Sequence, residues 1–155
     1  MLGLVLAIRV ALGAVLVAAA VGKLISRPDK RDLLIAGAEG LLAAALLSGL
    51  TPIIPALAVC AVAVAYVGHA VFTREQKCNC FGSRLPATSR TGQLFRNGVF
   101  GVLAMAYTLS LGLAGSPGLS LADGLLPIGI GILAGLALIV VPWAFEWSLG
   151  VDPVA

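Results

Sequence analysis

The sequence predicts an all-α integral membrane protein, a helical bundle of four core transmembrane helices followed by a fifth. Of the 155 residues, 60% are hydrophobic and only 11% are charged, whereas an average soluble domain is about half apolar and about one quarter charged. The hydrophobic residues also gather in long runs separated by short polar segments. Ten basic and seven acidic side chains are too few to cover a soluble domain of this size, so a lipid bilayer is the expected surrounding.

The first three runs predict three transmembrane helices connected as hairpins. They cover Leu2–Ile25, Leu33–Leu50 and Ile53–Thr73. At about 1.5 Å per residue, each is close to the length needed to cross a hydrocarbon core of about 30 Å. A charged turn follows the first run, and Thr51-Pro52 ends the second, because proline disfavours continuation of a helix. The first run has no basic segment before it and contains Arg9, so it is expected to be retained rather than cleaved as a signal peptide.

The remainder of the chain predicts two more helices. The longest polar connection, 74–93, precedes a fourth run at Leu94–Leu113, and a fifth run extends over Leu121–Phe145. The fifth contains two prolines and ends among aromatic residues, as at a membrane interface. We therefore divide the chain into a four-helix membrane domain, 1–114, and a linker with an additional helix, 115–155.

The basic residues predict the orientation of the bundle. They lie in or beside two of the connections, whereas the other two turns hold none, and this asymmetry marks cytoplasmic loops. The prediction is a multi-pass protein of the cell membrane with its cysteine loop in the cytoplasm. No continuous basic tract with interleaved aromatics is present, so nucleic acid is not an expected partner. Apart from Arg9, which lies inside the first run, the basic residues at these two connections are Lys23, Arg27, Lys30, Arg31, Arg74, Lys77, Arg84, Arg90 and Arg96.

Cys78 and Cys80 are the residues in the polar connection best suited to chemistry. Separated by one residue, their Cα atoms can lie about 5.5 to 7 Å apart, near the range that a disulfide bridges. Nearby basic residues favour the thiolate that disulfide exchange requires, and Gly82 permits a tight turn after Phe81. The spacing alone leaves other interpretations open: an unreactive pair, a structural disulfide, or half of a metal site completed by His69.

Cys60 is the third cysteine and lies within the third hydrophobic run. A small apolar packing role is expected for it. A relay role is disfavoured because Cys60 precedes Cys78 by 18 residues, which is about 27 Å along a helix.

Glu39 is the clearest functional or structural candidate inside a predicted span. A charge at the centre of a membrane helix costs roughly 2.5 to 3.5 kcal/mol, so it requires a partner or water. Lys23 lies near the matching end of the first helix, which predicts a Glu39–Lys23 pair. Arg9 is the second candidate partner of Glu39. It lies nearer the opposite end of the first helix, so its side chain would have to extend toward Glu39 or else snorkel outward to the membrane surface.

Several polar residues are predicted to share one leaflet of the membrane. His69 precedes the cysteine loop by about one turn, and Arg96 with Asn97 opens the next helix at the same surface. The alternative is that Lys23 and Arg96 anchor the chain to lipid headgroups, that Asn97 caps a helix and that His69 is merely interfacial. The residues that would gather there are Lys23, Glu39, His69, Cys78, Cys80, Arg96 and Asn97.

These features together resemble the methylamine utilisation MauE family, which is similar to the broader DoxX-like group of small membrane proteins. The resemblance covers roughly residues 5 to 110. Its motifs, in order, are Arg9, Gly22-Lys23, Glu39, Cys78-Asn79-Cys80-Phe81-Gly82 and Arg96-Asn97.

The resemblance implies a redox accessory protein that works with a thioredoxin-like partner to mature a disulfide-rich extracytoplasmic enzyme, of which methylamine dehydrogenase is the type. Cys78 and Cys80 would be its redox pair, and no cofactor or resident metal is expected. The rival function is a membrane scaffold that binds a metal or small molecule through Cys78, Cys80 and His69. Transport is disfavoured, since no inverted repeat is evident. The cytoplasmic side given by the charges conflicts with the oxidising compartment in which disulfides form.

Overall fold

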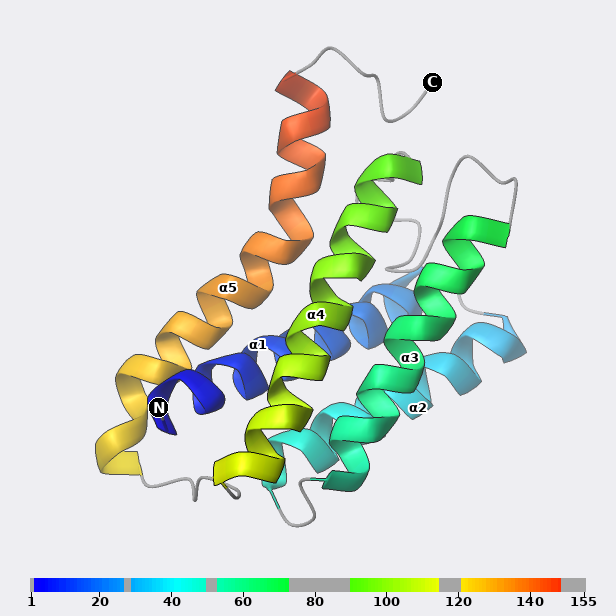
Figure 1. The fold of residues 1–155 in the computed structure, drawn as a ribbon. Helices are drawn as coiled ribbons and strands as arrows, with labels where there is room; N and C mark the ends of the chain where they lie inside the picture. Colours follow the sequence, from blue (N-terminus) through cyan, green and yellow to red (C-terminus); the bar gives the residue numbers. More distant parts are fainter. Residues whose placement is uncertain (1, 27–28, 50–52, 73–89, 115–120, 149–155) are drawn as a thin grey trace.

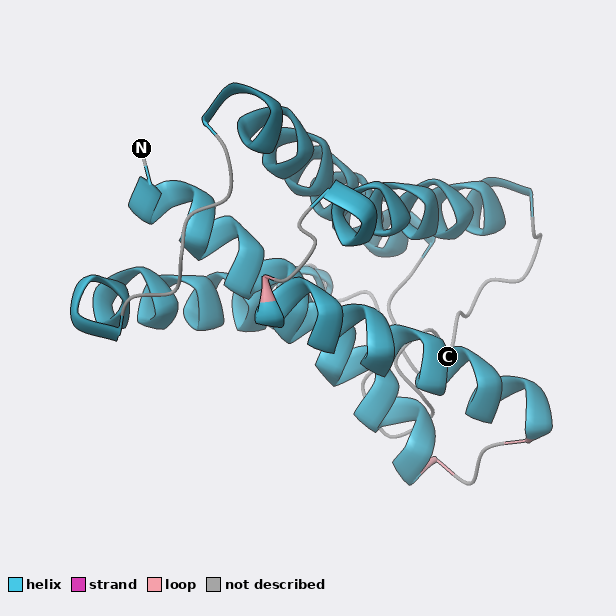
Figure 2. Cartoon of the chain, turned by 90° about the horizontal axis from the view of Figure 1, so that it is seen from below, coloured by secondary structure: helices cyan, strands magenta, loops and turns pink. Residues whose placement is uncertain are grey.

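The described part of the chain forms five helices. The computed structural model describes residues 2–26, 29–49, 53–72, 90–114 and 121–148, and no strand occurs among them (Figure 2). The predicted all-helical membrane bundle is thus confirmed. The helices are α1 (Leu2–Ile25), α2 (Lys30–Ser48), α3 (Ile53–Phe72), α4 (Arg90–Ala114) and α5 (Leu121–Ser148).

Two helices begin earlier than the hydrophobic runs indicate. α2 starts at Lys30 because Asp29 caps it, its side chain accepting a hydrogen bond of 2.7 Å from the backbone N–H of Asp32. α4 starts at Arg90, four residues before the predicted start at Leu94. The hydrophobic runs place both helix starts too late, because the first turn of each helix is polar.

The first four helices form two antiparallel hairpins. Figure 1 shows the α1–α2 hairpin crossing the α3–α4 hairpin, with α5 along the side of α1. The antiparallel direction follows from side-chain contacts: Cys60 of α3 meets Thr108 of α4, and Tyr66, nearer the end of α3, meets Asn97, nearer the start of α4. The end of α1, the start of α2, the end of α3 and the start of α4 consequently lie toward one end of the bundle.

α1 is the central helix of the bundle. It contacts α2, α4 and α5, and it supplies half of the buried hydrophobic residues in the described part of the chain, among them Leu12 and Leu16, which are almost inaccessible. In the described part of the chain, α1, α4 and α5 are long and apolar enough to cross a membrane, while the apolar stretch of α3, Ile53–His69, is shorter. α2 falls outside this group because charged residues fill its first turn and Glu39 interrupts it.

Two glycines allow α5 to approach α1 closely. A Cβ atom at Gly131 would stand 2.6 Å from the backbone oxygen of Ala7, and one at Gly135 would stand 3.0 Å from the backbone oxygen of Ala11. Their spacing is the Gly-x-x-x-Gly pattern through which membrane helices pack. α5 remains a continuous helix across Pro127.

Replacing Gly131 with leucine should separate α5 from α1. The new side chain would meet backbone, which cannot rotate away, and overpacking of this kind costs about 1–3 kcal/mol or more. We expect a lower melting temperature of the detergent-solubilised protein and faster proteolysis between α4 and α5. Gly129→Leu is the matched control, since no atom lies within 4 Å of the corresponding Cβ position. Equal stability of the two variants would contradict the packing.

Candidate functional site

A buried ion pair joins the first two helices. Nζ of Lys23 lies 2.7 Å from Oε1 and 2.8 Å from Oε2 of Glu39, so the ammonium donates to both carboxylate oxygens. The two side chains are only 7% and 3% exposed. The structure therefore contains the pair that the sequence predicts, and each charge supplies the partner that the other needs inside the bundle.

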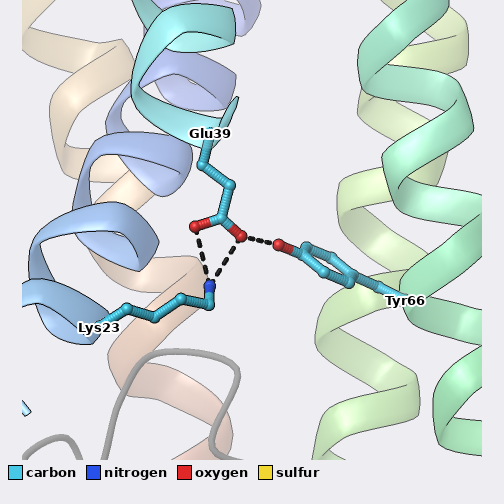
Figure 3. A network of polar contacts seen from close by, with 3 residues as sticks. All are labelled: Lys23, Glu39 and Tyr66. Atoms are coloured by element: carbon cyan, nitrogen blue, oxygen red, sulfur yellow. Dashed lines mark hydrogen bonds and ion pairs between the residues drawn. The ribbon is translucent and has the colours of Figure 1, made fainter. Parts of the chain in front are cut away.

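Tyr66 adds a third helix to this pair. Its hydroxyl donates a hydrogen bond to Oε1 of Glu39, so one carboxylate receives donors from both α1 and α3 (Figure 3). We define Lys23, Glu39 and Tyr66 as the buried triad. Tyr66 was not among the predicted residues, because the rule that a buried charge needs a partner does not extend to a neutral phenol. The sequence feature that could have indicated Tyr66 is its position one turn before His69, at a depth in the membrane similar to that of Glu39.

Arg96 and Asn97 lie beside the buried triad. Each is 5% exposed, and both line a small cavity together with Tyr66, Phe100 and α1. Nδ2 of Asn97 donates a long hydrogen bond, 3.4 Å, to the backbone carbonyl of Tyr66. Lys23 and Arg96 are consequently not exposed headgroup anchors, and Asn97 is not a helix cap, because it lies about two turns into α4.

Arg9 has a different role from the two that the sequence suggested. Nε and Nη2 donate hydrogen bonds of 2.6 and 2.5 Å to the backbone carbonyls of Leu46 and Leu47, at the end of α2. Because Arg9 is 1% exposed, it does not snorkel outward. It lies about seven residues of α2, or about 10 Å, from the level of Glu39. A guanidinium at this position satisfies carbonyls that a helix end leaves open and complements its dipole.

His69 and Cys60 are not among the buried polar residues: Cys60 packs against the hydrophobic core instead. His69 is exposed in the last turn of α3. Cys60 is a free, half-buried cysteine whose Sγ lies 3.4 Å from Oγ1 of Thr108, so it contributes to the α3–α4 contact. In the regions that the structure describes, no three His, Cys, Asp or Glu side chains come together as a possible metal site.

The predicted redox motif, with Cys78, Cys80, Phe81 and Gly82, lies outside the described residues. The helices that flank it are described. Tyr66 precedes the last residue of α3 by six residues, and Asn97 follows the first residue of α4 by seven, so each lies about 10 Å along its helix from the motif-bearing segment. The buried triad, Arg96 and Asn97 thus occupy the end of the bundle at which this segment joins it.

Chemically, this end of the bundle combines fixed charge with exchangeable protons. The ammonium of Lys23, the carboxylate of Glu39 and the phenol of Tyr66 are joined by hydrogen bonds in apolar surroundings, where such bonds are electrostatically stronger than in water. The same bonds hold α1, α2 and α3 in register.

The chain was compared with known proteins. The family model described as Methylamine utilisation protein MauE matches residues 31–110, a little over half of the chain, from the start of α2 through most of α4. Comparison with curated proteins and with solved structures gave no significant match. The matched region contains Glu39 and Tyr66 of the buried triad, Arg96 with Asn97, and the paired cysteines. The chain therefore belongs to the MauE family of membrane proteins that take part in methylamine utilisation.

Proposed function

We propose that this protein is a membrane thiol–disulfide redox accessory that exchanges electrons with a thioredoxin-like partner through Cys78 and Cys80. The exchange supports disulfide formation in, or maturation of, an extracytoplasmic enzyme of the methylamine dehydrogenase type. Family membership supports the pathway, and the paired cysteines of the sequence supply the chemistry.

The proposed exchange proceeds through a mixed disulfide. A thiolate of the partner attacks one sulfur of the Cys78–Cys80 disulfide, forming an intermolecular S–S bond and releasing the other cysteine as a thiolate. The partner's second thiolate then attacks the mixed disulfide, which leaves the partner oxidised and both cysteines of this chain reduced. Two electrons pass to this chain, and each released thiolate takes up a proton.

The observation that carries this proposal is the buried polar residues at the end of the bundle that bears the cysteine segment. A reactive pair needs rigid support on both sides. Lys23, Glu39 and Tyr66 hold α1, α2 and α3 together there, and Asn97 links α4 to α3.

The cysteines are tested by trapping the mixed disulfide in cells. Because the partner's second cysteine resolves the mixed disulfide, a thioredoxin-like partner in which that cysteine is replaced by serine is expected to accumulate a covalent complex with the wild-type chain, identified by mass spectrometry. The Cys78→Ser/Cys80→Ser double variant should abolish enzyme maturation while the protein level stays unchanged. Cys60→Ser is the matched control and should retain activity. Normal maturation in the double variant would rule out the proposed function.

The charge distribution favours a cytoplasmic position of the cysteine segment, whereas direct exchange with a partner that matures an extracytoplasmic enzyme requires the opposite side of the cell membrane. Thiol labelling tests the position that the charges predict. In a Cys60→Ser background, a membrane-impermeant maleimide should label Cys78 and Cys80 only after the cells are permeabilised. Labelling of intact cells would place the segment on the other side.

A further inference from the structure

The described helices pack as two units. Contacts are extensive between α1 and α2, between α1 and α5, and between α3 and α4, and they are much less extensive where α3 or α4 meets the other three helices. We define α1, α2 and α5 as the base unit, and α3 with α4 as the second hairpin (Figure 1). Two units that share only a small interface are expected to move relative to each other.

Hydrogen bonds between side chains and neighbouring helices reinforce each unit. Arg9 and Lys23 of α1 bond to α2 within the base unit. Asn97 and Thr108 of α4 bond to α3 within the second hairpin. Each unit is thus fixed by polar contacts of its own, in addition to its more extensive packing.

Tyr66 connects the two units. Its hydroxyl donates to Oε1 of Glu39 in the base unit, and Lys23 fixes that carboxylate from α1 (Figure 3). Its backbone carbonyl accepts the hydrogen bond of Asn97, so the same residue is also tied to α4. One phenol therefore joins α2 of the base unit to both helices of the second hairpin.

The interface beside Tyr66 leaves room for displacement. A small cavity lies there between Leu16 and Ala19 of the base unit and Phe100 of the second hairpin. Protein interiors are normally close-packed, and close packing resists sliding. Apolar contacts across this interface also hold it weakly, because lipid chains are as apolar as the side chains that they would replace. A hydrogen bond across the interface consequently contributes much of its fixed geometry.

We propose that the second hairpin shifts as a unit against the base unit, and that Tyr66 is the positioning residue that holds it in the arrangement seen here. Residues 73–89 connect the two helices of this hairpin, so a shift moves both attachment points of the segment that contains Cys78 and Cys80. The consequence for thiol exchange rests on the proposed function.

Distances between pairs of spin labels test the shift without using the cysteines. All three native cysteines are replaced with serine, and labels are attached at new cysteines on strongly exposed positions of the full-length protein in lipid nanodiscs. Leu4 and Phe72 form the pair between the units, since they lie at opposite ends of the bundle on α1 and α3. Phe72 and Leu113 form the pair within the second hairpin and share one label site with the first pair.

Tyr66→Phe removes only the hydroxyl that crosses the interface. Double electron–electron resonance should then show a second distance between Leu4 and Phe72, populated about threefold or more above its level with Tyr66 present. The distance between Phe72 and Leu113 should stay unchanged. Thr108→Val is the matched control, because it removes one hydroxyl from a contact inside the second hairpin and should leave the distance between the units unchanged.

The outcomes separate this proposal from the proposed function. An unchanged distance between the units in the Tyr66→Phe variant, or equal broadening of both pairs, overturns the positioning role. In cells, Tyr66→Phe with all cysteines intact should lower enzyme maturation about tenfold at an unchanged protein level. A shifted distance with normal maturation supports the movement and overturns its part in thiol exchange. Normal maturation in the Cys78→Ser/Cys80→Ser variant overturns the proposed function and leaves the measured distances to decide the movement.

Discussion

Replacing Glu39 with leucine is expected to lower the free energy of unfolding by about 3–5 kcal/mol, the usual cost of removing one partner from a buried ion pair. The change leaves the Lys23 ammonium inside the bundle without its carboxylate and removes the acceptor of the Tyr66 hydroxyl. Glu39 joins α1, α2 and α3 through side-chain hydrogen bonds (Figure 3). Reversible unfolding by SDS in mixed micelles measures the loss.

A second variant distinguishes an unpaired charge from simple loss of packing. The Lys23→Met/Glu39→Leu double variant removes both charges, and replacing a buried pair with apolar residues is often neutral or stabilising. We expect the double variant to recover most of the stability that Glu39→Leu loses. If the double variant is as unstable as the sum of its single changes, the two side chains are energetically independent, contrary to their geometry.

Arg9→Leu is expected to produce the second-largest loss of stability, at the opposite end of the first hairpin. Two hydrogen bonds from a charged donor to the carbonyls of Leu46 and Leu47 disappear, and with about 1.5–3 kcal/mol for each such bond the free energy of unfolding should fall by about 3 kcal/mol. The same SDS titration measures this change. Arg9→Lys should recover part of the loss, because an ammonium can reach one carbonyl but lacks the planar fork.

Gly49 provides an independent test of the same contact. Its φ of 70° is a left-handed conformation that glycine adopts without strain, and a Cβ atom there would stand 2.5 Å from Nη2 of Arg9. Gly49→Ala should therefore destabilise the wild-type chain clearly and the Arg9→Leu chain less. Gly40→Ala is the control, since it lies within α2 with no atom near its Cβ position. An equal effect of Gly49→Ala in both backgrounds would show that Arg9 does not approach Gly49.

The approximate depth of the buried polar residues was predictable from the sequence. In a series of hairpins, distance along the chain from each turn gives the depth of a residue, which is why Lys23, Glu39, Arg96 and Asn97 could be assigned to one end of the bundle. The unfavourable energy of an isolated charge in a membrane then predicts the pairing of the acid with the nearest base. That reasoning applies only to charged groups, so it does not extend to the neutral phenol of Tyr66.

The partners of Arg9 were not predictable in the same way. Any helix end offers open carbonyls, so nothing in the sequence marks Leu46 and Leu47 as acceptors, and the contact depends on how α1 and α2 are rotated about their axes. The spacing of Gly131 and Gly135 predicts close packing of α5 against another helix, but the pattern does not identify that helix as α1.

By itself, the sequence determined that this protein is a helical membrane bundle of the MauE family, since composition, the length of apolar runs and the order of a few polar residues are properties of the chain alone. Only the tertiary structure decided that α1 is central and that Tyr66 completes the buried triad. The physical reason is that hydropathy and spacing specify the depth of a residue in the membrane. Its direction around the helix axis, and therefore its neighbours, depends on the packing of the other helices.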